Sequence, residues 1–234
     1  FLGVKSLLTK FIVQSGFVMT FTKSKEIANL LVTNIPQDLL LAIQEALIVG
    51  AERAYNGTKQ LDKGHVKNAR GQMRHFEQNQ AFHSALLTHG IDVSELSGNK
   101  IVVGRIGIWN IARGTANDDN WHSLKRSKSR QLLAQKNAFM ENLVYGNLFD
   151  EESPKEGTVF FISSFSKNAD SQLERPISIQ IAVCDKFMNN WLFIESIEKF
   201  IERYNFEQII QPQEQKDLAT PALKSGKQMY GTSE

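Results

Sequence analysis

A change in apolar spacing near residue 90 is the feature that most constrains the fold of this chain. Before it, apolar residues recur every three to four positions, as on one face of a helix. After it, they form short runs rich in Ile, Val and Phe, which are typical of strands. The spacing predicts helices over 24–35, 36–57 and 62–89, with Pro36 opening the second and Gly90 closing the third. The chain is therefore expected to begin with three helices in series.

The part of the chain beyond residue 90 supplies the predicted strands. Extended segments are expected over Lys100–Arg113, Thr158–Phe165, Ile177–Cys184 and Trp191–Ile194, with one helix over Ser123–Tyr145 and a short one over Ile194–Tyr204. The polar loops between the last three strands have lengths that fit antiparallel pairing. The predicted fold class is α+β: N-terminal helices followed by a mainly antiparallel four-stranded sheet with packed helices, the helix from Ser123 covering one face.

The predicted domain organisation is a single α+β domain over residues 23–210. Its parts carry opposite charge, and no linker rich in Pro or Gly divides them. Residues 1–22 are expected to be an upstream or flexible segment, since Met19 opens a stretch that looks like an ordinary bacterial start and residues 1–18 would precede it. Residues 211–234 are rich in Gln, Lys, Gly and Ser and are predicted to form a disordered tail.

Composition narrows the class of protein. A hydrophobic content of 41% with 22% charged residues is typical of a globular chain, and no run approaches the ~20 apolar residues of a transmembrane helix. The single cysteine, Cys184, excludes an internal disulfide and is expected to pack in the core. We therefore expect a cytoplasmic protein without membrane contact. Rossmann and Walker phosphate loops are absent and the histidines lack metal-binding spacing, so neither a cofactor nor a metal is predicted.

Positive charge is concentrated in the middle of the chain. Residues 59–136 carry 13 Lys and Arg against 6 Asp and Glu, whereas residues 137–234 carry 9 against 15. Lys125, Arg126, Lys128 and Arg130 fall in the first two turns of the helix predicted from Ser123. A helix N-terminus already carries partial positive charge, so these cations would favour a bound anion. The alternative is a solvated face, or cations paired with Asp118 and Asp119.

The leading hypothesis is a protein of prokaryotic type, from a mobile element or a defence system, that binds nucleic acid or another phosphorylated polyanion. Trp109 offers a further stacking surface, unless it belongs to the core. The alternative is an interaction protein of a toxin–antitoxin or phage-defence pair, whose basic face meets an acidic protein partner. The predicted phosphate or nucleic-acid site comprises Arg105, Arg113, Trp121, His122, Lys125, Arg126, Lys128 and Arg130, supported by Lys67, Arg70 and Arg74.

A second alternative is an enzyme. The segment Arg70-Gly-Gln-Met-Arg-His75 has the spacing of arginine and histidine that resembles the signature of the helical HEPN ribonucleases. That resemblance implies metal-independent RNA cleavage, with His75 in acid–base catalysis and Arg70 stabilising the charged phosphorane. It covers about six residues, Gly71 stands where the family has a polar residue, and the family fold is all-helical. Glu214 and Lys216 have a nuclease-like spacing but fall in the predicted tail, so whether the protein is an enzyme stays open.

Overall fold

The computed structural model describes residues 24–117, 120–145, 156–166 and 174–210, with side chains as far as residue 205. It begins with a helix over 24–34, followed by α2 (Gln37–Thr58) and α3 (Lys63–Thr88), so the three predicted N-terminal helices are confirmed. The mixed helix and sheet class is also confirmed. The predicted segments 1–22 and 211–234, including Glu214 and Lys216, lie outside the described residues.

The sheet differs from the expected one in size and direction. The described residues form six strands in the order β1-β2-β3-β4-β5-β6 rather than four. Neighbours pair antiparallel except β3 and β4, which are parallel over their whole length, from Trp109 opposite Gly157 to Asn117 opposite Phe165. The strands are β1 (Asp92–Val93), β2 (Val103–Ile106), β3 (Trp109–Asn117), β4 (Gly157–Phe165), β5 (Ser178–Cys184) and β6 (Trp191–Ser196).

The run predicted as one strand over Lys100–Arg113 is a hairpin. Gly107 has φ +52°, a left-handed conformation that glycine adopts readily, and it turns β2 back along β3. Arg105 is therefore paired with Asn110 and shares its face of the sheet, whereas Arg113 lies on the opposite face with Trp109 and Ile111. The prediction of one continuous strand is wrong, because a turn inside the run reverses the chain.

The helix predicted over Ser123–Tyr145 is divided into three. They are the 3-10 helix η1 (Trp121–Arg126), α4 (Lys128–Gln135) and α5 (Ala138–Tyr145), and together they join the parallel strands β3 and β4. The break before α5 is held by buried Asn137, whose Nδ2 donates to the carbonyls of Thr158 and Cys184 at 3.1 and 2.8 Å. A local side-chain network thus replaces the continuous helix that the apolar spacing suggested.

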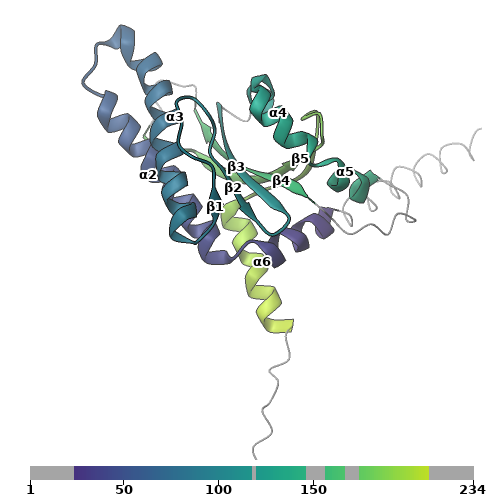
Figure 1. The fold of residues 1–234 in the computed structure, drawn as a ribbon. Helices are drawn as coiled ribbons and strands as arrows, with labels where there is room; N and C mark the ends of the chain where they lie inside the picture. The colour runs from purple at the N-terminus through teal and green to yellow at the C-terminus, as the bar shows by residue number, and fades with distance from the viewer. Residues whose placement is uncertain (1–23, 118–119, 146–155, 167–173, 211–234) are drawn as a thin grey trace, which may run out of the picture.

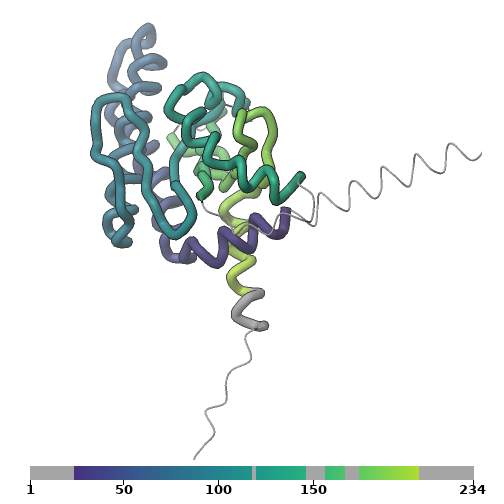
Figure 2. The backbone as a smooth tube through the Cα atoms, turned by 45° about the vertical axis from the view of Figure 1, so that its right-hand side comes forward, coloured from purple at the N-terminus to yellow at the C-terminus, as the bar shows by residue number. Residues whose placement is uncertain are grey.

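Helices cover both faces of the sheet (Figures 1 and 2). The helix over 24–34, α2, α3 and α6 (Ile197–Ile210) bury the face that carries Val159 and Phe161 of β4. The opposite face, with Phe160 and Ile162, packs against η1 and α4. The hairpin of α2 and α3 reaches past the sheet, as Figure 1 shows. None of the helices in the described ranges has the length and apolar character needed to cross a membrane.

Candidate anion-binding site

Arg113 lies at the centre of a polar cluster between β3 and α3. It is only 1% exposed. Its Nε donates to Asn79 Oδ1 at 2.7 Å, and its Nη1 donates to Gln78 Oε1 and Thr115 Oγ1 at 3.2 and 3.3 Å. Its Nη2 donates to the backbone carbonyl of His75 at 2.6 Å and lies 3.3 Å from His75 Nδ1. Every one of these partners is electrically neutral, so the hydrogen bonds of Arg113 are satisfied but its charge is not balanced.

The acceptors around Arg113 are positioned by the spacing of α3. His75, Gln78 and Asn79 stand at i, i+3 and i+4 and so share one side of the helix. Gln78 Nε2 also donates to the Leu47 carbonyl at 2.9 Å, and Asn79 Nδ2 donates to the Lys100 carbonyl at 2.9 Å. These second bonds fix both amides with their oxygens toward the guanidinium.

Tight helix packing allows this arrangement. A Cβ atom built on Gly50 of α2 would lie 2.7 Å from Gln78 Cα of α3, which is closer than real Cβ contacts come. Only glycine therefore allows α2 to approach the backbone of α3 at this point. The buried Gln78 is thereby pressed against the sheet, where its Nε2 also lies 3.3 Å from Ser163 Oγ of β4.

His75 is held in its neutral form. A guanidinium only donates hydrogen bonds, so His75 Nδ1 accepts from Arg113, and the ring also makes a hydrogen bond to the backbone of Asn99. Burial lowers the pKa of His75, and the charges of Arg113 and Arg130 lower it further, against the opposing effect of the Asn99 bond. If Nδ1 of His75 were protonated, its N–H and the Arg113 Nη2 group would face each other as two hydrogen-bond donors.

Arg130 brings a second guanidinium to the same place. It stands in the first turn of α4 and is partly buried, and its Nε donates to the Arg113 carbonyl at 3.4 Å. Burial lowers the pKa of Arg130. Burial, and to a smaller extent the nearby charge of Arg130, lowers the pKa of Arg113 to about 9. In the described ranges no carboxylate pairs with either arginine, and the two terminal nitrogens of Arg130 have no hydrogen-bond partner.

Arg74 adds a third cation from α3. Its Cζ lies 3.5 Å from the ring centroid of Phe165, the last residue of β4. Burial, followed by the charge of Arg70, lowers the pKa of Arg74 to about 10. We call Arg74, Arg113 and Arg130 the arginine cluster. It lies toward the carboxyl ends of the parallel strands β3 and β4, the place where open α/β sheets commonly bind ligands.

The basic residues of the predicted helix start do not act as one group. Lys125 and Arg126 belong to the last turn of η1, where the helix carries partial negative charge, so the predicted conflict with the dipole does not arise for them. Lys125 Nζ donates to Asn189 Oδ1 in the β5–β6 turn. Only Lys128 and Arg130 stand in the first turn of α4, and of these Lys128 is exposed while Arg130 turns toward β3.

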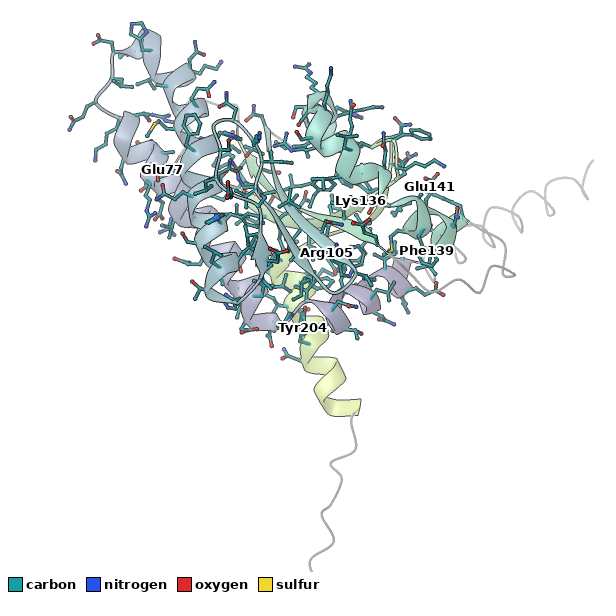
Figure 3. The ribbon with its side chains drawn as sticks, viewed as in Figure 1. Glu77, Arg105, Lys136, Phe139, Glu141 and Tyr204 are labelled. Carbon is teal, nitrogen blue, oxygen red and sulfur yellow. The ribbon has the colours of Figure 1, made fainter. Side chains whose placement is uncertain are left out.

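The remaining predicted site residues lie in three other places. Arg105 is exposed on β2 (labelled in Figure 3), on the face opposite Arg113, and its charge acts on Glu156. Trp109 is fully buried and donates to the Leu30 carbonyl at 3.3 Å, so the predicted stacking role of Trp109 is wrong. Lys67 is exposed on α3. Trp121 and His122 stack on one another in η1.

Arg70 and His75 are directed to different neighbours. The guanidinium of Arg70 lies 4.7 Å from the Tyr55 ring centroid, and its Nε is 3.4 Å from Thr58 Oγ1 of α2. His75 faces Arg113 instead. The residues that sequence reasoning missed are Gln78 and Asn79. Two amides one turn beyond a basic stripe on an amphipathic helix gave no signal that they would be buried.

Other chemistry gains no support in the described residues. No group of three or more His, Cys, Asp or Glu side chains there could hold a metal ion. Cys184 is buried as predicted, and burial together with Asp185 raises the pKa of its thiol to about 12, which leaves it unreactive. Comparison of the chain with protein-family models, curated proteins and solved structures gives no match. Its function is therefore argued from geometry alone.

Proposed function

We propose that the protein binds nucleic acid or another phosphorylated polyanion at the arginine cluster. Arg130 grips a phosphate, and Arg113 keeps the site positive and holds its frame. The observation that carries the proposal is the charge balance. Arg113 and Arg130 are withdrawn from water, yet their described partners are all neutral. Removing an ion from water costs several kcal/mol unless an opposite charge compensates it, and a bound phosphate supplies that charge.

Arginine is the side chain best suited to such a ligand. Its planar fork donates two parallel hydrogen bonds to a phosphate, and its weak hydration makes partial burial tolerable. Arg130 has this fork available, because only its Nε is engaged, at 3.4 Å. A chain with net charge +2 whose middle third is strongly basic also attracts polyanions at long range.

The ribonuclease hypothesis receives no such support. Arg70 packs on Tyr55, and both the backbone carbonyl and the Nδ1 of His75 are engaged by Arg113. A pair that must converge on one scissile phosphate is thus directed to two different neighbours. An acidic protein partner would satisfy the same charges, and it would appear as a stoichiometric protein that co-purifies without nucleic-acid absorbance.

The experiment is a salt titration of oligonucleotide binding by fluorescence anisotropy. Wild type should bind at low salt, and its affinity should fall steeply toward physiological salt. Arg130→Ala should reduce the slope of log affinity against log salt concentration by roughly 0.7–0.9, which corresponds to about one phosphate contact. Arg105→Ala is the matched control, since it removes an exposed arginine whose charge acts on Glu156, and it should leave both affinity and slope near wild type. Equal slopes for wild type and Arg130→Ala would contradict the proposal.

A further inference from the structure

Three aromatic rings of η1 and β6 pack against one another. The rings of Trp121 and His122 are stacked with centroids 4.3 Å apart and an interplanar angle of 28°. Trp121 in turn lies 4.7 Å from Trp191 of β6, and both tryptophans pack on the core beneath η1. His122 is exposed. We call these three residues the aromatic stack, and its outermost ring is presented to solvent.

The stack is rigidly placed. Asn120 N donates to the Asn117 carbonyl at 3.1 Å and Ser123 Oγ donates to the Asn120 carbonyl at 3.2 Å, so the end of β3 is tied to the start of η1. One turn later, Leu124 is buried against Gly114, where an added Cβ would lie 2.7 Å from Leu124 Cδ2. The backbone on both sides of His122 is therefore tied to β3, and the ring itself rests on Trp121.

The helix η1, which carries two rings of the stack, and Arg130 of α4 contact neighbouring residues of β3. Leu124 of η1 covers Gly114, and Arg130 of α4 bonds the carbonyl of the preceding residue, Arg113. Trp121 lies one 3-10 turn before Leu124, about 6 Å along the helix. An exposed aromatic face and an available guanidinium thus lie within the dimensions of a few nucleotides.

An exposed ring of this kind discriminates between forms of nucleic acid. In a duplex the faces of the bases are stacked on one another and closed to side chains, whereas unpaired bases stack on aromatic residues, including histidine. Resting on the proposed function, we infer that the ligand is single-stranded nucleic acid, with one unpaired base stacked on His122 and a neighbouring phosphate held by Arg130.

The test compares a short fluorescein-labelled oligothymidine with a blunt duplex of the same length, at one low salt concentration, on the full chain. Wild type should bind the single strand more tightly than the duplex and show quenching of tryptophan emission on binding. His122→Ala should weaken oligothymidine binding about five-fold or more, with the salt slope unchanged, because stacking carries no phosphate contact. His122→Phe should retain the affinity, and His65→Ala, which removes an exposed histidine of α3, should match wild type.

The outcomes separate the two proposals. Duplex binding as tight as single-strand binding, or oligothymidine affinity unchanged in His122→Ala, overturns the aromatic stack as a base platform. If Arg130→Ala still flattens the salt slope in that case, the phosphate site stands alone. Binding of neither probe overturns both. Loss of binding in His122→Phe as well as in His122→Ala assigns the residue to structure rather than to stacking, and this too overturns the inference.

Discussion

Buried polar groups are balanced differently at the start and in the middle of β3. At its start, Asn110 Nδ2 donates to Glu156 Oε1 at 2.9 Å, and Lys136 (labelled in Figure 3) reaches the same oxygen at 2.6 Å, so cation and carboxylate balance. Three residues later, Arg113 is surrounded by amides, a hydroxyl and an imidazole with no carboxylate among its partners. The first arrangement is complete by itself, whereas the second retains positive charge that a ligand can use.

The difference also follows the layers of the fold. The balanced pair lies where α4 ends and β4 begins, partly exposed, with the Lys136 and Glu156 side chains 38% and 33% exposed. Within the arginine cluster, Arg113 is buried between α3 and the parallel strands, whereas Arg74 and Arg130 are partly exposed. A charge left unbalanced in the more buried of two sites is the costlier one, so it is the better evidence for a binding role.

The largest expected effect is on stability. Arg113→Ala leaves the Asn79 oxygen without its Arg113 donor, leaves the Gln78 oxygen with only the bond from Thr115 Oγ1 at 3.3 Å, and opens a cavity. We therefore expect a loss of about 3 kcal/mol or more in the free energy of unfolding. Urea denaturation followed by far-UV circular dichroism measures it. Arg105→Ala, exposed on β2, should stay within about 0.5 kcal/mol of wild type. If Arg113→Ala loses less than about 1 kcal/mol, the buried polar network in the middle of β3 contributes no more to stability than the exposed groups at its start.

The second prediction tests the retained charge directly. Tripolyphosphate at a free concentration about 100 times its Kd should stabilise wild type by roughly 2.7 kcal/mol, because it binds only the folded state. This stabilisation is measured as a rise in Tm. Arg130→Ala should show only a small part of that rise at the same tripolyphosphate concentration. Sodium chloride of matched ionic strength is the control for screening. An equal rise with chloride would mean that the cluster holds no specific anion.

The helices of this fold were predictable and the parallel pair of strands was not. The stripes of α2 and α3 fixed those elements within a few residues, because Pro36 and Gly90 punctuate a regular pattern. The segment around Gly107 was predicted to be one strand, because a turn inside a run of Ile and Val leaves the spacing of the apolar residues unchanged. The parallel pairing of β3 with β4 joins residues that are 48 positions apart in the chain, and no local pattern encodes such a pairing.

The site was half predicted for related reasons. Arg113, Arg130 and Arg74 were chosen because of their charge. The structure brings Arg113 and Arg130 together and places Arg74 over Phe165, at the end of the adjacent strand β4. Lys125 and Arg126 were expected to join them at a helix N-terminus, but the helix begins only at Lys128. Gln78 and Asn79 could not be found at all, because an amide becomes a buried ligand of arginine only through tertiary packing.

The third prediction concerns pH and is smaller. The pKa of His75 is lowered in the folded protein, chiefly by burial and then by Arg113, so the unfolded chain takes up the proton first as pH falls. Stability should therefore be complete above the ordinary histidine value of about 6.5 and should decline as pH drops below it toward the folded value. His75→Gln, which keeps hydrogen-bonding capacity but does not titrate, should flatten the urea midpoint profile over that window. A profile as steep as that of wild type would exclude His75 as the titrating group.

The smallest effect should come from the balanced end of β3. The hydrogen bond from Lys136, with that from Asn110, lowers the pKa of Glu156, so its contribution should be present above the ordinary carboxyl value and be lost as pH falls through the folded one. Because the pair is about one third exposed, solvent screening limits Glu156→Gln to a cost of about 0.5–1 kcal/mol. Oligonucleotide affinity should not change, since the pair already satisfies itself. If Glu156→Gln instead binds oligonucleotide more tightly, the negative charge of this carboxylate acts on the arginine cluster. The start and the middle of β3 would then form one electrostatic site.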